Sequence, residues 1–371
     1  MRKRIFLNCL IAAGFVIGLA FMSGCEGPEG PRGPQGPAGA DGTDGTDGQD
    51  GVDGSVTCLQ CHSAETPQII QEQFAQSVHS AGQIAVDYAG GRSSCARCHS
   101  SEGFIEFART GTVEENITAP SAWECKTCHS IHTTFEQVDF ALRLADPVTL
   151  LFDGTTTIDL GNSNLCANCH QARTAAPNIA APADSFEITS THYGPHHGPQ
   201  ANVLYGVGFA EIAGTYTYPE PGTFPHVADE EGKCVGCHMY TYGNGAGGHT
   251  YNPSLDACND CHGASEPDFN HGNIQVRVEE LLEDLRDLLV AKGVVEFVNE
   301  EHYELDPETG NVELVVTPEG YEPIVGKYPM ILAQAFFNWI GLEEDRSEGV
   351  HNPNYVEALL ENTIEAVEAL P

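Results

Sequence analysis

Cysteine and histidine recur together in this sequence at one fixed spacing. Twelve of the fourteen cysteines fall in six copies of the pattern Cys-x-x-Cys-His. The cysteines are Cys58 and Cys61, Cys95 and Cys98, Cys125 and Cys128, Cys166 and Cys169, Cys234 and Cys237, and Cys258 and Cys261; the histidines that follow them are His62, His99, His129, His170, His238 and His262. Two thiols at this spacing can form thioethers to the vinyl groups of a porphyrin while the adjacent imidazole binds the iron, as in c-type haem attachment. The alternative, a disulfide or zinc scaffold, does not need a histidine after every second cysteine.

Six irons would each need a sixth ligand, and ten further histidines are present to supply it. Methionine is scarce, and Met239 directly follows the proximal His238, so it cannot reach the far face of the same haem. Ligation by two histidines is therefore predicted, which places the reduction potentials low because axial-ligand identity sets much of their range. The candidate distal ligands are His79, His132, His192, His197, His226, His249 and His351. We rank His196, His271 and His302 below these.

The position of His132 carries a geometric consequence. It follows the proximal His129 by three residues, so it lies on the proximal side of that haem. If His132 binds iron, it must bind the iron of a neighbouring haem, and two haems are then held close together.

The N-terminal residues 1–24 are predicted to be a bacterial lipoprotein signal peptide. Arg2-Lys3-Arg4 is followed by an apolar run from Ile5 to Phe21 and by small residues before Cys25, the pattern of an export signal. Cys25 would become the lipidated first residue of the mature chain. The alternative is an uncleaved transmembrane anchor, because the apolar run approaches spanning length. Both alternatives export the rest of the chain, most simply to the outer membrane or cell surface, with the periplasmic side left open.

Residues 25–54 follow as a collagen-like spacer. Glycine recurs at every third position from Gly27 to Gly54, the period that a triple helix requires. The triplets are few and their second half lacks proline. A monomeric, extended, acidic spacer is therefore favoured, and a short trimerising stalk through residues 27–54 is the alternative.

Residues 55–272 carry all six motifs and are predicted to form a hexahaem cytochrome domain. They show little sustained periodicity and many turn-forming residues, which indicates a loop-rich wrapper around stacked porphyrins. Residues 273–371 lack cysteine and show helical periodicity, with a hairpin across 306–310 and a last helix after Asn352-Pro353. We expect them to pack on the haem domain as helices. The predicted fold class is a multihaem cytochrome c, mainly α with much irregular loop.

The charge balance excludes some partners. Sixteen Lys and Arg stand against 53 Asp and Glu, for a net charge of −37. Binding to a nucleic-acid backbone needs clustered cations, so nucleic acid is excluded as a partner. The acidic surface favours a cationic partner or metal ions instead.

With these motifs the chain resembles the exported multihaem c-type cytochromes of bacteria. The blocks His192–Gln200 and Gly247–Thr250 look like those of surface multihaem lipoproteins of the cytochrome c-552/c-554 type. The stretch Gly349–Pro353 is similar to the C-terminal haem-ligating segment of pentahaem nitrite reductases. Those reductases use lysine as the proximal ligand of their catalytic haem, whereas all six motifs here end in histidine, a departure that argues against nitrite reduction.

The function predicted from these features is electron transfer, with other redox proteins or an extracellular electron acceptor as partners and six haem c groups as cofactors. No catalytic residue is assigned. The alternative is a multihaem reductase or oxidase of a small nitrogen or sulfur compound, which would need one haem with an open sixth position. A mainly structural surface protein is a third hypothesis.

Overall fold

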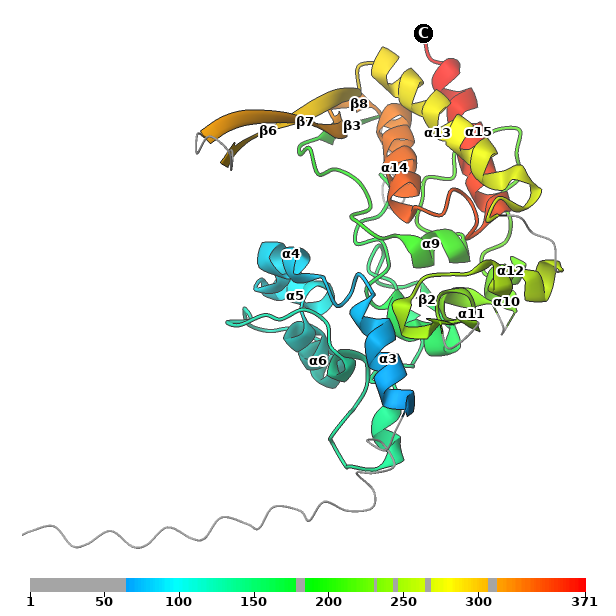
Figure 1. Cartoon of the computed structure of the whole chain (residues 1–371). Coiled ribbons are helices and arrows are strands. Elements are labelled where there is room, and N and C mark those ends of the chain that lie inside the picture. Colours follow the sequence, from blue (N-terminus) through cyan, green and yellow to red (C-terminus); the bar gives the residue numbers. More distant parts are fainter. Residues whose placement is uncertain (1–64, 178–183, 230–231, 243–245, 264–267, 306–311) are drawn as a thin grey trace, which may run out of the picture. The chain divides into compact units, whose positions relative to one another are not determined.

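The computed structural model describes residues 65–177, 184–229, 232–242, 246–263, 268–305 and 312–371. All of these belong to one compact unit, Gly54–Pro371 (Figure 1). The predicted signal peptide, the predicted lipidation site Cys25, the collagen-like segment and the first Cys-x-x-Cys-His motif lie outside the described residues. Within the described residues, no helix is long and apolar enough to cross a membrane.

The part of the chain that carries the motifs is built from short helices joined by loops. Its helices are α3 (Glu65–Ala75), α4 (Gln83–Ala85), the π-helix η1 (Val86–Gly90), α5 (Ser93–His99), α6 (Ser101–Thr110), α7 (Cys125–Cys128), η2 (Gln137–Phe140), η3 (Gly161–Ser163), α8 (Asn164–Ala167), α9 (Gln200–Tyr205), α10 (Pro225–Ala228), α11 (Lys233–His238), η4 (Gly248–Thr250), α12 (Leu255–His262) and η5 (His271–Asn273). Such short helices bury little apolar surface of their own, so other contacts must hold them in place.

The strands described in this region are equally short. They are β1 (Val148–Thr149), β2 (Thr157–Ile158), β3 (Ser185–Ile188), β4 (Thr241–Tyr242) and β5 (Ala246–Gly247). Antiparallel pairing joins β1 to β2 and β4 to β5. A small apolar cluster lies under β1, β2, α8 and α9 and includes Leu150, Ile158, Ala167 and Leu204. The fourth motif, which begins on α8, is thereby fixed to a packed support.

The C-terminal residues form longer elements. They are α13 (Ile274–Ala291), the hairpin strands β6 (Val295–Leu305) and β7 (Val312–Pro323), β8 (Gly326–Pro329), α14 (Met330–Asp345) and α15 (Pro353–Glu368). The last helix begins as the sequence predicts, with the Asn352 side chain accepting a hydrogen bond from the backbone of Tyr355 and Pro353 in the first turn. The hairpin is longer than the turn at 306–310 alone suggests, because its ladder runs from Val295 opposite Pro323 to Leu305 opposite Val312.

The C-terminal helices share one core with residues of the motif-bearing region. Leu285, Phe336 and Leu359 from α13, α14 and α15 pack together with Ile188 and Val203. Strand β3 pairs antiparallel with β8, joining residues 185–188 to residues 326–329. The C-terminal helices therefore brace the loops that carry several of the predicted ligands (Figure 1).

Buried asparagines strengthen this connection. Asn338 is fully buried; its side chain accepts a hydrogen bond from Ala210 N and donates to Ala210 O, both at 2.9 Å. Asn362 makes the same pair of bonds to the backbone of Tyr216, at 2.9 and 2.8 Å. Each amide satisfies backbone groups of a loop that has no regular partner, so these loops are held rigidly against α14 and α15.

Candidate haem-ligating sites

Each of the five Cys-x-x-Cys-His motifs within the described residues starts on a short helix. The motifs begin on α5, α7, α8, α11 and α12 in chain order. Residues three apart share one face of a helix, so a single turn brings both thiols to one side with the histidine next to them. None of the ten cysteines in these five motifs forms a disulfide. These cysteines are thus thiols, the form from which the thioether bonds that the spacing predicts are made.

Each of the five described proximal histidines faces one different histidine from elsewhere in the chain. The ring centroids are 6.1 Å apart for His99 and His196, 6.2 Å for His129 and His249, 6.0 Å for His170 and His79, 6.3 Å for His238 and His351, and 6.1 Å for His262 and His226. We name these pairs the second to sixth sites, after the order of their motifs. The sequence separations vary widely, so the fold and not local spacing makes the pairs.

The separation within the pairs fits an iron atom between the rings. Two bonds of about 2 Å from imidazole nitrogen to metal, plus about 1 Å from each nitrogen to its ring centroid, give about 6 Å. Two other histidine contacts in the same region are closer, at 4.0 Å between His262 and His271 and 4.9 Å between His79 and Tyr251. Within the described residues, no three His, Cys, Asp or Glu side chains converge as they would around a bare metal ion.

Hydrogen bonds fix which ring nitrogen of several paired histidines is free. Five of these rings donate a hydrogen bond through Nδ1–H. The pairs are His129 to Phe140 O (2.6 Å), His170 to Gln200 Oε1 (3.2 Å), His226 to Val350 O (2.9 Å), His238 to Tyr251 O (2.9 Å) and His351 to Asp345 Oδ1 (2.7 Å). A ring that donates through Nδ1 keeps the Nε2 lone pair for a metal. The tautomer of these rings is therefore the one that ligation through Nε2 requires.

Burial keeps most of the paired rings neutral, which is the form that binds a metal. It lowers the pKa of His79 to about 4, with a further contribution from the neighbouring His170. Burial and then Arg173 lower the pKa of His196 to about 4. Burial also lowers the pKa values of His99, His170, His226, His238 and His249. His351 differs: burial lowers its pKa, but the Asp345 carboxylate outweighs burial and the pKa lies above its ordinary value.

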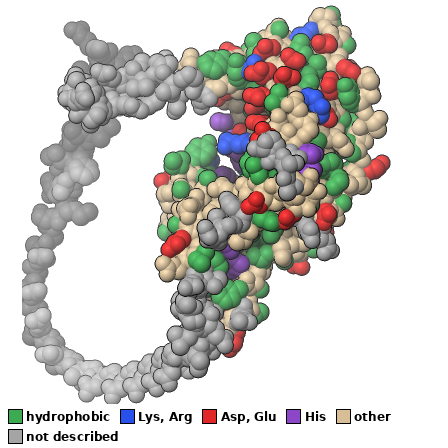
Figure 2. Space-filling view, turned by 45° about the vertical axis from the view of Figure 1, so that its right-hand side comes forward, with side chains coloured by type: hydrophobic (Ala, Val, Ile, Leu, Met, Phe, Trp, Pro, Cys, Tyr) green, Lys and Arg blue, Asp and Glu red, His purple; other side chains and the backbone are tan. Residues whose placement is uncertain are grey.

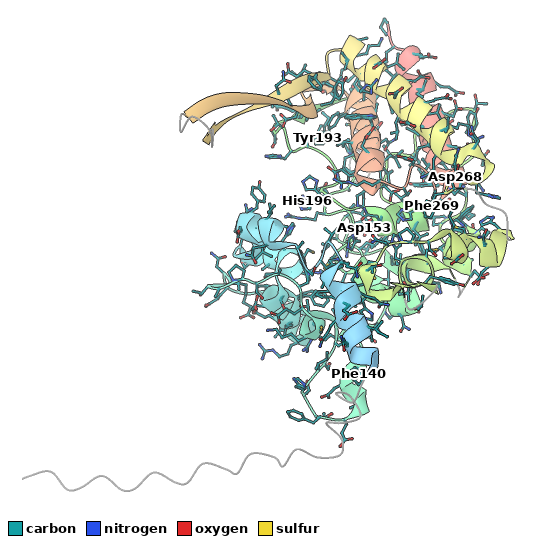
Figure 3. The ribbon with its side chains drawn as sticks, in the orientation of Figure 1. Phe140, Asp153, Tyr193, His196, Asp268 and Phe269 are labelled. Atoms are coloured by element: carbon teal, nitrogen blue, oxygen red, sulfur yellow. The ribbon has the colours of Figure 1, made fainter. Side chains whose placement is uncertain are left out.

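At the second site the structure places His196 opposite His99, whereas the sequence analysis ranked His197 higher. The His197 side chain is exposed, and its Nδ1 lies 2.8 Å from Glu344 Oε1 on α14. That hydrogen bond raises the pKa of His197. His196 belongs to the loop that joins β3 to α9. Figure 3 shows this loop passing between α14 and the helices α4 and α5. Its backbone has φ of +74°, a conformation uncommon outside glycine, and the sequence alone does not reveal it.

Four of the seven predicted distal ligands, His79, His226, His249 and His351, each face one proximal histidine. The others lie elsewhere. His192 is exposed. His132 stacks on Phe135 with ring centroids 5.5 Å apart and has φ of +62°. Among the histidines ranked lower, the ring of His271 lies against His262, and the side chain of His302 is outside the described residues.

Large apolar side chains remain exposed close to these histidines. Val78, beside His79, is 85% exposed, and Phe135 and Phe140, near His129 and His132, are 53% and 48% exposed. Apolar groups at such exposure call for a covering surface. A porphyrin is a flat, largely apolar plate that would provide it.

Contacts between motifs show which sites are neighbours. The second and fourth motifs touch: Arg97 Nη2 donates to Asn168 Oδ1 at 2.9 Å, Cys98 Sγ lies 3.8 Å from Asn168 O, and Cys169 Sγ lies 3.7 Å from Arg97 O. The Arg97 guanidinium also lies 3.7 Å above the centre of the Phe107 ring. Both motifs are thereby held in one fixed arrangement.

The fourth motif also touches the fifth. Val235 N donates to Ser163 Oγ at 3.0 Å, and the thiols of Cys166 and Cys234 are hydrogen-bonding neighbours. The fifth and sixth sites meet where His226 donates to Val350 O, because Val350 precedes His351. The fourth motif therefore lies between the second and the fifth.

Tyr251 connects three sites, and the sequence analysis did not single it out. Its ring lies 4.9 Å from that of His79 and 6.1 Å from that of His249, and its carbonyl accepts the hydrogen bond of His238. The residue has φ of +58°, a strained conformation for a bulky side chain. Burial raises the pKa of its phenol. The third, fourth and fifth sites thus converge on one residue.

Sequence comparisons find similar proteins among the polyhaem c-type cytochromes. No protein-family model matches the sequence. The C-type polyheme cytochrome OmcB of two Geobacter sulfurreducens strains is 25% identical over 301 residues, covering 74% of this chain and 37% of OmcB. The C-type polyheme cytochrome OmcC of Geobacter sulfurreducens is 25% identical over 342 residues, covering 76% of this chain and 43% of OmcC. The chain is thus similar in sequence to these polyhaem c-type cytochromes.

The chain spans about two fifths of the length of the curated proteins that it matches. Among solved structures, the outer cell wall cytochrome OcwA aligns with 80% of this chain and 49% of its own, at a TM-score of 0.47 and 17% identity.

Proposed function

We propose that this chain is an exported electron-transfer cytochrome that holds six covalent haem c groups, each ligated by two histidines. The observation that carries the proposal is the set of five histidine pairs with ring centroids 6.0–6.3 Å apart, each containing one motif histidine. In this proposal the paired cysteines of each motif would hold a haem c group covalently, and the two imidazoles would be its iron ligands. The bound group would supply one-electron chemistry.

The first motif completes the set. Its residues Cys58, Cys61 and His62 lie outside the described residues. We propose His132 as its distal ligand, because His132 stacks on Phe135 beside exposed apolar side chains and, three residues after His129, must serve a haem other than that of His129. The first haem would then lie next to the third, because His132 follows His129 by three residues.

The contacts between motifs support a continuous path for electrons. Thioether bonds tie each porphyrin edge to its cysteines, so motifs that touch bring porphyrin edges close together. The fourth site would receive electrons from or pass them to the second, third and fifth sites, and the fifth would continue to the sixth. The buried Asn338 and Asn362 hold the adjoining loops against α14 and α15. This support would keep the distances between haems fixed, as electron hopping requires.

An enzymatic role at an open haem is less well supported. It would need a motif histidine that faces no second ligand, and each of the five described motif histidines faces one. Six-coordinate irons have no position for a nitrogen or sulfur substrate. We therefore propose transfer of electrons to or from another redox protein or an extracellular acceptor.

Location and partners follow from the N-terminal sequence and the charge. A signal peptide, a lipid on Cys25 and a spacer over 27–54 would tether the haem unit at the outer membrane or cell surface. Exposed acidic residues gather on the outer face of α13, at Glu279, Glu280, Glu283, Asp284 and Asp287, and Figure 2 shows acidic side chains over the C-terminal helices. Such a surface attracts cationic partners. Comparing the solution mass with and without residues 27–54 distinguishes a spacer from a trimerising stalk.

The number of covalent haems tests the proposal. Intact mass spectrometry of the purified, denatured protein is expected to show six haem masses above the apoprotein, because thioether bonds survive denaturation. A variant with both Cys95 and Cys98 replaced by alanine is expected to carry five. A wild-type protein with fewer than six covalent haems, or with haem that acid extraction removes, would contradict it.

A further inference from the structure

The fifth site differs from the other described sites in the groups that accept hydrogen bonds from its two histidines. His351 Nδ1 lies 2.7 Å from Oδ1 of Asp345, whose side chain is 2% exposed. The second carboxylate oxygen, Oδ2, accepts a hydrogen bond from the Ser347 hydroxyl. Opposite His351, His238 Nδ1 donates to Tyr251 O at 2.9 Å. Both axial ligands of the fifth site therefore donate to oxygen, and one of these oxygens belongs to a buried carboxylate.

The local backbone is shaped to create this contact. Helix α14 ends at Asp345, and the following turn has positive φ at Arg346 (+59°), Glu348 (+48°) and Gly349 (+89°). A Cβ on Gly349 would lie 2.7 Å from the Val278 side chain on α13, so glycine lets the turn pass close to that helix. The turn doubles back and returns His351 to the carboxylate at the helix end.

The other described sites lack this carboxylate. His129 and His226 donate to backbone carbonyls, and His170 donates to the neutral amide of Gln200 at 3.2 Å. At the second site, the buried Nδ1 of His99 makes no hydrogen bond of standard geometry, although the backbone of Ala85 lies near enough to favour its charged form.

A carboxylate that accepts a hydrogen bond from an imidazole changes the reduction potential of the metal that this imidazole binds. It draws the Nδ1 proton toward itself, which makes Nε2 a stronger donor and favours the more highly charged, ferric iron. A buried negative charge near the iron acts in the same direction, because little water screens it. Hydrogen bonds to carbonyl or amide oxygens act in the same sense but more weakly, since they carry no full charge.

Building on the haem ligation proposed above, we propose that Asp345 is a positioning residue that makes the fifth haem the lowest in reduction potential among the five described sites. The second haem, whose buried His99 Nδ1 lacks a hydrogen bond of standard geometry, is then higher. The fourth motif touches both, so the reduction potential rises from the fifth site to the second along a connected path. Electrons on the fifth haem would run downhill in that direction.

The test is a potentiometric titration of the complete holoprotein, followed by visible absorption. In the wild type, the last step to be reduced is expected to involve about one sixth of the absorbance change. Asp345→Asn keeps a side chain of the same shape and removes the charge, so the lowest midpoint should rise and merge with the other steps. Glu344→Gln is the matched control, because it removes the same charge one residue earlier, beside the non-ligating His197. It should leave the lowest midpoint unchanged.

A second variant moves the potential in the opposite direction. Ser347→Ala removes a hydrogen bond to Asp345 Oδ2 and leaves the carboxylate a stronger acceptor for His351, so the lowest midpoint should fall. If the Asp345→Asn variant loses a haem, the lowest midpoint of Ser347→Ala tests the role of Asp345 instead. A lowest midpoint that does not move in a six-haem, low-spin variant would overturn the role of Asp345 and leave the proposed function intact. Failure of the wild type to bind six low-spin haems would instead overturn the proposed function.

Discussion

Replacing His79 with alanine is expected to convert one haem in six from low-spin to high-spin. His79 faces His170 at 6.0 Å and is the second ligand that the structure offers to the fourth site. The haem itself would stay attached, because Cys166, Cys169 and His170 are untouched. The ferric protein should therefore keep its full haem mass, gain a high-spin EPR signal from about one sixth of its iron, and bind carbon monoxide at one haem when reduced.

The same substitution should interrupt electron transfer through the protein, because the fourth motif lies between the second and the fifth. Added imidazole should restore the low-spin signal by filling the open position. His192→Ala is the control, since His192 is exposed and should leave all spectra unchanged. A His79→Ala protein that stays entirely low-spin would show that another residue ligates the fourth haem.

A second experiment separates two adjacent histidines. His196→Ala is expected to open the second site and give one high-spin haem in six, because His196 lies 6.1 Å from His99. His197→Ala should leave every haem low-spin, since the His197 ring bonds to Glu344 and does not face a motif histidine. The two variants differ by one position and remove the same group, so general effects of substitution cancel. EPR of both ferric proteins makes the comparison.

The His197 variant carries a separate consequence at the surface. Its loss leaves Glu344 without the hydrogen bond that lowers the pKa of that carboxyl. The expected rise in the pKa of Glu344 is small, because the His197–Glu344 pair is partly exposed and solvent screens it. If His197→Ala produced the high-spin haem and His196→Ala did not, the placement of His196 and His197 described above would be wrong.

Much of the candidate site can be predicted from the sequence, because covalent haem attachment requires a fixed local pattern. Six motifs identify the cysteines and the proximal histidines directly. Distal ligands follow no such spacing. His249 and His351 reach His129 and His238 only through the tertiary fold, and the preference for His197 over His196 reflects a backbone angle that no residue type announces.

The supporting residues were harder to foresee. Asp345 lies in an acidic stretch that reads as an exposed helix end, yet the turn at Gly349 brings His351 back onto it. The carbonyl of Tyr251 serves His238 through a strained backbone, and Arg97 inside the second motif holds the fourth. The C-terminal helices were predictable from periodicity and caps, whereas the pairing of β3 with β8 depends on a long-range contact.

The most direct test of the account is the spin state of the ferric haems, measured by EPR on the complete purified protein at neutral pH. Two histidines on each of six irons predict that all the iron is low-spin and that no high-spin signal accounts for as much as one haem. A high-spin signal from one haem or more in the unaltered protein would mean that an iron lacks its second histidine. That result would contradict ligation by two histidines throughout and would direct attention to an open haem that binds a substrate.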